Sequence, residues 1–186
     1  MIYSKQGVPE EHKNSTYDSF DWTNKEQLRE ILLQFVSGER EKGLVLIGKP
    51  GVGKSHLMVG TYFELQEKGI FPGSGVVYFD YQNLLNYLRD GFQLKIRGDA
   101  AIESLCMVRY LIIDDIKPEP RGEFWKEILE QIFEYCYNNQ TKILLSTNAD
   151  DSDELISRWG LMDYHVSRLT HMADVIALQG EDYRAK

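Results

Sequence analysis

Cysteine, proline and positive charge are all scarce in this sequence. Its two cysteines, Cys106 and Cys136, stand far apart in the chain, which argues against a disulfide framework or a clustered thiolate metal site. We expect both to be core thiols of a cytoplasmic protein. The apolar runs are no longer than strands, which excludes a membrane-spanning helix and hence a membrane partner. The polar start, residues 1–15, lacks the apolar segment of a signal peptide.

Basic residues are outnumbered by acidic ones, 21 to 29, which gives a formal net charge of −8. A basic nucleic-acid-binding surface over the whole molecule is therefore excluded. Any contact with DNA must be local, assembled by oligomerisation, or made through another protein. With 186 residues, 42% of them hydrophobic, the chain is expected to form one domain with a substantial core.

Apolar strand-like runs alternate with helix-like segments along the chain. Strands are expected at 44–47, 76–79, 110–113, 143–146 and 175–178. Helices are expected at 24–37, 55–68, 82–89, around 125–136, at 151–159 and at 161–170, whereas 91–99 has the polar composition of a loop. Residues 1–23 lack periodicity and are expected to be an N-terminal arm before a domain at 24–186. The alternation predicts an α/β fold with a parallel sheet covered on both faces.

Residues 48–55, GKPGVGKS, match G-x-x-x-x-G-K-[S/T] at every fixed position and lie between an expected strand and helix. Glycines let backbone N–H groups approach phosphates, and the helix N-terminus adds its positive dipole end. We expect Lys54, solvent-facing without nucleotide, to neutralise the β- and γ-phosphates of ATP, and Ser55 to coordinate Mg²⁺. The residues expected to bind the nucleotide are Gly48, Lys49, Pro50, Gly51, Val52, Gly53, Lys54, Ser55 and His56.

Two aspartates follow the apolar run at 110–113. Because ligands of open α/β sheets bind at the carboxyl ends of the strands, we expect Asp114 to be the partner of Mg²⁺. Asp115 is then placed to orient or deprotonate the attacking water. Aspartates after a buried strand also cap helices, but the phosphate loop favours the catalytic interpretation.

Asn148 and Arg168 are candidates that the residues alone leave open. Asn148 follows the apolar run at 143–146, where its amide would approach the γ-phosphate, yet asparagine is equally typical of a turn. Arg168 would stabilise transition-state charge in a neighbouring subunit if it lay at a subunit boundary. By composition alone, a solvated surface arginine is the commoner case.

Taken in order, the motifs FDW at 20–22, GKPGVGKS, LIIDD, LLSTN, SRL and a terminal G-x-x-Y-R at 180–184 resemble those of one family. They are similar to the AAA+ ATPases of the bacterial DnaC/DnaI helicase-loader group, whose architecture the transposition helper IstB and, more distantly, the initiator DnaA share. The resemblance covers residues 16–186. The combination of LIIDD, STN and the terminal motif makes it specific.

This resemblance implies a P-loop NTPase sandwich of three layers, with a five-stranded parallel sheet in the order 5-1-4-3-2 and no C-terminal lid domain. By position, Lys54 and Ser55 match the Walker A motif, and Asp114 and Asp115 match Walker B. The resemblance further implies that Asn148 is sensor 1 and Arg168 the arginine finger, both catalytic. Asp115 stands where AAA+ proteins usually have glutamate, so slow hydrolysis is implied.

The implied partners are a replicative helicase and single-stranded DNA, engaged by an ATP-dependent homo-oligomer. Loaders usually carry an N-terminal helicase-binding domain, whereas only residues 1–23 precede the first expected helix here, so a minimal protein and an excised ATPase domain both stay open. One alternative is an IstB-like transposition helper on duplex DNA. A second is a small P-loop kinase, whose lid would be 91–99 with Lys95 and Arg97. A third is a module that binds nucleotide without turnover. Arg89, Lys95 and Arg97 are the candidate DNA contacts.

Overall fold

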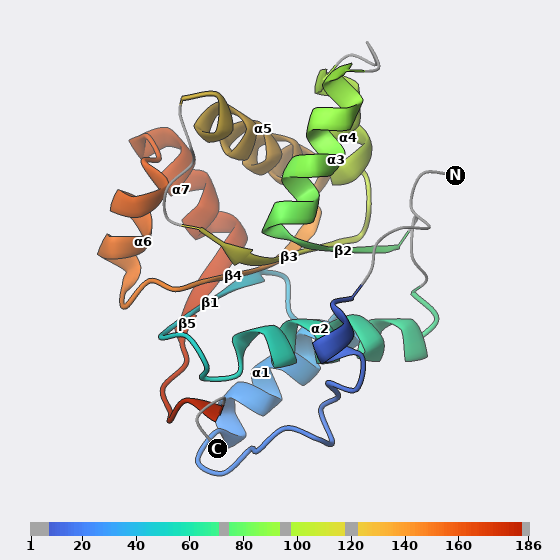
Figure 1. Ribbon diagram of the computed structural model, residues 1–186, viewed down its shortest axis with the longest axis vertical. Helices are drawn as coiled ribbons and strands as arrows, with labels where there is room; N and C mark the ends of the chain where they lie inside the picture. Colours follow the sequence, from blue (N-terminus) through green and yellow to red (C-terminus); the bar gives the residue numbers. More distant parts are fainter. Residues whose placement is uncertain (1–7, 71–74, 94–97, 118–122, 184–186) are drawn as a thin grey trace.

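The computed structural model describes residues 8–70, 75–93, 98–117 and 123–183 (Figure 1). Five strands of these residues form one sheet in which all neighbours run parallel. They are β1 (Gly43–Ile47), β2 (Val76–Asp80), β3 (Tyr110–Ile116), β4 (Lys142–Thr147) and β5 (Ala173–Ala177). The order across the sheet is β2-β3-β4-β1-β5. This is the predicted order read from the other edge, so the α/β class and the topology are confirmed.

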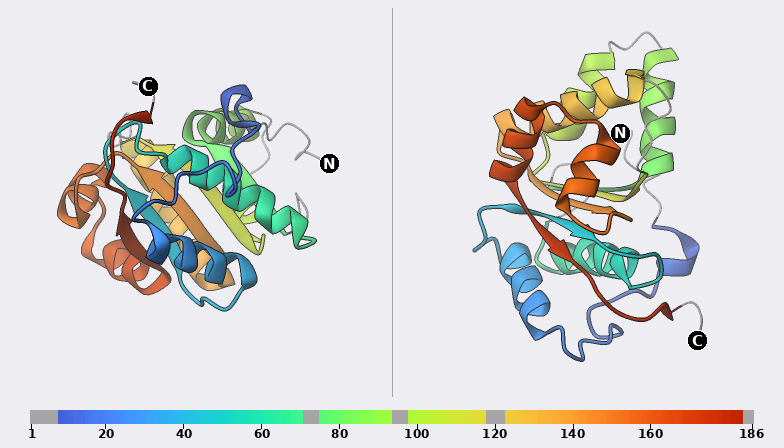
Figure 2. Two further views of the ribbon diagram at one scale, coloured as in Figure 1. Left: turned by 90° about the horizontal axis from the view of Figure 1, so that it is seen from below. Right: turned by 90° about the vertical axis from the view of Figure 1, so that its left-hand side faces the viewer.

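Helices cover both faces of the sheet, giving three layers (Figures 1 and 2). One face carries α1 (Glu26–Ser37) and α2 (Lys54–Glu67). The other carries α3 (Tyr81–Gln93), α4 (Gly98–Cys106), α5 (Glu123–Asn139), α6 (Ser152–Trp159) and α7 (Asp163–Met172). Strands β1 to β4 are largely buried between these layers, which explains their apolar runs, whereas the edge strand β5 is only partly buried. No helical lid domain follows β5 in the described part of the chain.

The first helix shows how directly the periodicity predicts packing. The side of α1 that faces the sheet carries its buried residues, Leu28, Leu32, Phe35 and Val36. They follow the i, i+4, i+7 spacing of an amphipathic helix. Gly38 ends the helix in the left-handed conformation with φ of 84°, which a glycine adopts without a steric penalty.

The prediction of a polar loop at 91–99 is wrong at both ends. Helix α3 continues through Gln93 and α4 begins at Gly98, while residues 94–97 lie outside the described ranges. Gly91 lies inside α3 and allows a close approach of α4, since a Cβ placed on Gly91 would lie 3.2 Å from the Cβ of Ala101. Helix α4, which carries the buried Ile102, was missed because it is short and its glycine and aspartate suggested a loop.

The described part of the N-terminal arm packs against α2 and the phosphate-loop candidate. A 3₁₀ turn at Glu10–His12 is followed by Tyr17 and Phe20, which are both buried. The Tyr17 hydroxyl is hydrogen-bonded to Thr61 Oγ1 over 2.7 Å, and Trp22 Nε1 donates to the Tyr17 carbonyl oxygen over 2.7 Å. Hydrophobic periodicity does not predict this packing, because the segment is irregular.

Both cysteines are free and buried, one on α4 and one at the end of α5. Although they are distant in sequence, the fold brings them together: a hydrogen bond with Cys106 and burial raise the pKa of the Cys136 thiol. Cys136 is therefore a protonated core thiol at neutral pH. Among the described helices, none has the length and apolar character needed to cross a membrane.

Candidate active site

The loop between β1 and α2 needs its glycines for two reasons. Gly51 and Gly53 have φ of 83° and 98°, a left-handed conformation that favours glycine. Space is also limiting: a Cβ on Gly51 would lie 1.8 Å from Asp182 Oδ1, and one on Gly53 would lie 2.7 Å from Phe20 Cε2. Segments from both ends of the described chain therefore pack directly against this loop.

The ammonium group of Lys54 is folded into the loop. Its Nζ donates to the carbonyl oxygens of Gly48 and Lys49 over 2.7 and 2.8 Å, and the residue is 6% exposed. The expectation that Lys54 faces solvent is wrong. Its ammonium group can be buried because hydrogen bonds to the loop carbonyl groups replace its hydrogen bonds to water. The contacts hold the positive charge inside the loop.

The two aspartates occupy an irregular stretch of β3. The register between β3 and β4 shifts between Ile113 and Ile116, and Asp115 has φ of 54°. This bulge turns consecutive side chains away from the alternation of a regular strand. As a result Asp114 is 3% exposed, whereas Asp115 is partly exposed, and both line the same cavity.

Two hydroxyl groups that the sequence analysis missed hold Asp114. Ser146 Oγ, on β4, donates to Asp114 Oδ1 and accepts the backbone N–H of Asp115 over 2.8 Å. Tyr78 on β2 donates to Asp114 Oδ2 over 3.2 Å. Burial and the neighbouring Asp114 carboxylate raise the pKa of Tyr78, so its phenol remains a donor at neutral pH. A signal existed for Ser146, which belongs to the STN triplet, but none for Tyr78.

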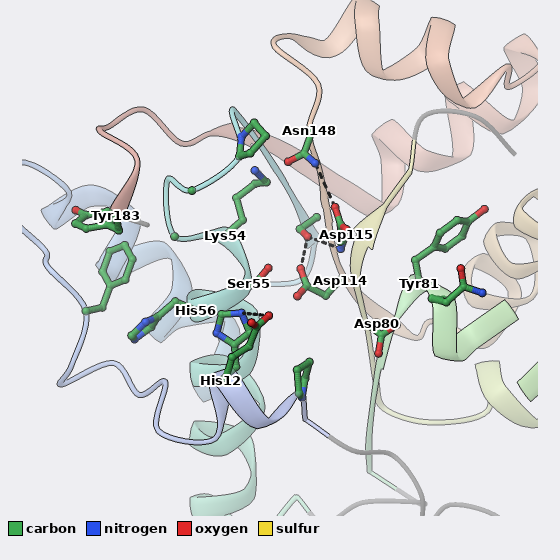
Figure 3. Close-up of a pocket in the computed structure, with 18 of the residues that line it drawn as sticks. His12, Lys54, Ser55, His56, Asp80, Tyr81, Asp114, Asp115, Asn148 and Tyr183 are labelled. Carbon is green, nitrogen blue, oxygen red and sulfur yellow. Dashed lines mark hydrogen bonds and ion pairs between the residues drawn. The ribbon is translucent and has the colours of Figure 1, made fainter. Parts of the chain in front are cut away.

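Asn148 lies beyond the end of β4 and reaches the second aspartate. Its Nδ2 donates to Asp115 Oδ1 over 3.2 Å (Figure 3). The two residues are brought together because β3 and β4 are parallel neighbours. The carboxylate that the sequence assigns to water activation therefore contacts the amide assigned to sensor 1.

A cavity of about 650 Å³ connects these groups. Figure 3 shows Lys54 and Ser55 facing Asp114, Asp115 and Asn148 across it. The other residues lining it are Pro9, Glu11, His12, Ser19, Phe20, Asp21, Pro50, Gly51, Gly53, His56, Asp80, Tyr81, Gln82, Lys117, Ser146 and Tyr183. Of the expected nucleotide-binding residues, Gly48, Lys49 and Val52 line a separate cavity of about 340 Å³ behind the loop.

His56, the last residue in the expected nucleotide-binding set, lies in the cavity wall beside the N-terminal arm. Its Nε2 is 2.8 Å from the Thr16 carbonyl oxygen and 3.1 Å from Ser19 Oγ. The Phe20 ring packs against its imidazole with 5.4 Å between centroids. His56 thus joins the arm to the start of α2.

Arg168 does not line the cavity. It lies on α7, where its Nη1 is 3.3 Å from Glu134 Oε1 and its side chain is 17% exposed. The guanidinium carbon lies 3.9 Å from the Tyr164 ring centroid and 5.2 Å from that of Tyr137. The arginine therefore has no contact with the candidate site of its own chain.

Of the candidate DNA contacts, the structure describes one. Arg89 is exposed on α3. Lys95, Arg97 and Arg184 lie outside the described residues.

Comparison with known proteins identifies the family. The IstB-like ATP binding protein family matches residues 9–186. The chain belongs to this family. The IstB-like chain is 28% identical over 179 residues to "Insertion sequence IS21 putative ATP-binding protein" of Pseudomonas aeruginosa, a match that covers 92% of this chain and 64% of that protein.

Solved structures give the same fold for this IstB-like domain. One titled as the DnaC helicase loader superposes with a TM-score of 0.76 and 27% identity, covering 91% of this chain and 99% of that one. A DnaA bound to AMPPCP and single-stranded DNA has a TM-score of 0.71 at 18% identity, covering 91% of this chain and 51% of that one. The latter likeness shows the fold alone. The expected resemblance to the AAA+ domains of DnaC, DnaI and DnaA is confirmed.

The side chains of the IstB-like cavity fit Mg-ATP. A positive charge lies inside a glycine-rich loop at the start of α2, which is an arrangement suited to phosphates. The buried Asp114 carboxylate and the Ser55 hydroxyl line the same cavity and are oxygen donors of the kind that Mg²⁺ prefers. The cavity volume is within the range of small-molecule sites.

Proposed function

We propose that this AAA+ domain binds Mg-ATP in the cavity and hydrolyses it slowly. The observation that carries the proposal is the Asn148–Asp115 hydrogen bond beside the buried Asp114, opposite Lys54 and Ser55. A nucleotide-binding pocket needs only the loop. The paired carboxylate and amide are the additional groups that hydrolysis requires.

Each residue has a distinct role in this proposal. Lys54 neutralises charge on the β- and γ-phosphates, and Ser55 and Asp114 would hold Mg²⁺, which would supply further positive charge to offset that of the phosphates. Asp115 orients the attacking water and accepts its proton. Asn148 positions the Asp115 carboxylate through their hydrogen bond and faces the γ-phosphate.

The proposed biological role is that of a helicase loader. In this role ATP drives assembly of a homo-oligomer that acts on a replicative helicase and single-stranded DNA. The support is the likeness to the DnaC helicase loader, nearly all of whose solved chain is matched at 27% identity. The net charge of −8 favours a site for DNA built by assembly over one on a single subunit.

A transposition helper that binds duplex DNA is the second candidate. The matching family and the insertion-sequence relative favour it. Since the chain spans 64% of that relative's length, the activity of the whole relative does not transfer with the domain.

Two measurements test these assignments. Phosphate release with Mg-ATP and no added acceptor tests hydrolysis, and its absence in the assembled protein would contradict it. Fluorescence anisotropy on oligo-dT and on a duplex, each with ATP, with ADP and without nucleotide, tests the role. A loader binds oligo-dT most tightly with ATP, whereas a preference for the duplex would favour the transposition helper.

A further inference from the structure

The chain after β5 returns to the phosphate loop and contacts it at its start and in its middle. The N–H of Leu178 donates to the Ile47 carbonyl oxygen over 2.8 Å, and the N–H of Tyr183 donates to the Gly51 carbonyl oxygen over 3.0 Å. The approach is close, since a Cβ on Gly48 would lie 2.3 Å from the Leu178 carbonyl oxygen. Figure 2 shows this segment beside the loop in its left-hand view.

The side chain of Tyr183 turns into the nucleotide cavity and has defined partners there. Its hydroxyl donates to Asp21 Oδ2 over 3.4 Å and accepts from Lys25 Nζ over 3.4 Å. The same ammonium lies 5.9 Å from the Tyr183 ring centroid and 5.7 Å from that of Phe20. A cation shared by two aromatic rings fixes their relative position.

The position of Tyr183 within the cavity indicates which part of a ligand it meets. In Figure 3 Tyr183 lies on the far side of Lys54 from Asp114 and Asp115. The phosphates are assigned to Lys54 and the metal to Asp114, so the rest of a nucleoside triphosphate must extend away from the aspartates. Phe20 and Pro50 also line the cavity with Tyr183, and flat apolar groups suit a planar base.

We propose that Tyr183 is a nucleoside-binding residue, which packs its ring against the base of the bound nucleotide while its backbone holds the phosphate loop through Gly51. The inference rests on the proposed binding of a nucleoside triphosphate in this cavity. It gives a function to the terminal motif, which the hydrolytic roles above do not use. Lys25, which contacts Tyr183 but does not line the cavity, is a positioning residue, because it acts on the nucleotide through Tyr183.

The test compares two ligands that share phosphates but not a base. Affinities of ATP and of inorganic tripolyphosphate, both with Mg²⁺, are measured by competition against a fluorescent ATP analogue. Tyr183→Ala is expected to weaken ATP binding about tenfold, the effect of losing one base–aromatic stack, and to leave tripolyphosphate binding unchanged. Tyr183→Phe keeps the ring and is expected to stay within about twofold of wild type for ATP.

Two further variants make the result specific. Tyr183→Leu keeps apolar bulk without a flat ring, so its ATP affinity should lie between those of the alanine and phenylalanine variants. Tyr137→Ala removes a partly exposed tyrosine of α5 that does not line the cavity and should change neither affinity. Circular dichroism checks the fold of each variant.

Several outcomes would overturn the inference. ATP affinity unchanged in both the alanine and leucine variants would show that the ring makes no contact with the nucleotide. Equal losses of ATP and tripolyphosphate would show that Tyr183 acts only by holding the loop. Failure of the wild-type protein to bind ATP is a different result, because it contradicts the proposed function itself.

Discussion

The Ser146 hydroxyl on β4 donates a hydrogen bond to the Asp114 carboxylate on β3. The same oxygen accepts the N–H of Asp115 over 2.8 Å. One side chain thus connects both aspartates to the neighbouring strand at the point where the register of β3 and β4 shifts. The orientation of the two carboxylates, which we propose bind the metal and activate water, therefore depends on a serine in the same cavity wall.

Ser146→Ala is expected to lower turnover and to raise the Mg²⁺ concentration needed for half-maximal activity. The change leaves the buried Asp114 with one donor fewer, which also costs about 1–3 kcal/mol of unfolding free energy. Phosphate release over a Mg²⁺ titration measures the first effect and urea unfolding the second. Ser167→Ala, at an exposed position of α7, is the control. An unchanged Mg²⁺ dependence would show that Ser146 is only structural.

Replacing each of the two aspartates by asparagine should have a different effect on Mg²⁺ dependence and turnover. Asp115→Asn removes a base and is expected to keep Mg-ATP binding while reducing turnover about a hundredfold or more, which is within the range for losing a general base. Asp114→Asn should weaken the Mg²⁺ dependence of ATP binding as well. Equilibrium binding with and without Mg²⁺, beside phosphate release, distinguishes the two. The opposite pattern would reverse the assigned roles.

Arg168 is expected to act on a neighbouring subunit, because in its own chain it lies against Glu134 and Tyr164 outside the cavity. Arg168→Ala should bind ATP nearly normally and lose turnover about a hundredfold or more. Mixing it with Lys54→Ala protein should restore part of the activity, since one composite site then has both groups. Phosphate release over a range of mixing ratios measures this.

Arg29→Ala, which removes an exposed arginine of α1 that does not line the cavity, is the matched control for the mixing experiment. Its mixture with Lys54→Ala should be as active as a mixture of wild type with Lys54→Ala. A mixture of Arg168→Ala and Lys54→Ala as inactive as either variant alone would count against a finger supplied in trans. In that case the contacts with Glu134 and Tyr164 would be the role of Arg168.

Mg-ATP should raise the midpoint of thermal unfolding. At a free concentration one hundred times the dissociation constant, binding to the folded state alone adds about 2.7 kcal/mol of stability. For a domain of this size that corresponds to about 5–10 °C. Differential scanning fluorimetry measures the shift, and Lys54→Ala should show none. An equal rise of the unfolding midpoint in both proteins would show that the nucleotide binds outside the phosphate loop.

The residue pattern predicted a parallel sheet and the approximate positions of its five strands, and the resemblance to the DnaC/DnaI group supplied their order. The core of each of the four strands β1 to β4 is a buried apolar run, a local pattern that can be recognised in the sequence without knowledge of the fold. Motifs also identified Lys54 and Asp115, and the family resemblance added Asn148, which the residues alone left open; all three line the cavity.

What the sequence could not predict depends on contacts between distant segments. Tyr78 reaches Asp114 because β2 lies beside β3, and no local pattern distinguishes that tyrosine from a core residue. Tyr183 and the N-terminal arm reach the cavity through irregular backbone, for which hydrophobic periodicity gives no signal. Lys54 was placed in solvent because its partners are carbonyl groups, which every residue possesses.

The most direct test of the central claim is an equilibrium titration of a fluorescent ATP analogue into wild type and Lys54→Ala in the presence of Mg²⁺. Lys49→Ala is the matched control, since its side chain is exposed and does not line the nucleotide cavity, while its backbone carbonyl is retained. We predict that Lys54→Ala abolishes binding without unfolding the protein and that Lys49→Ala binds within about threefold of wild type. Unchanged affinity of a folded Lys54→Ala protein would contradict the assignment of the loop, and with it the proposed ATPase site.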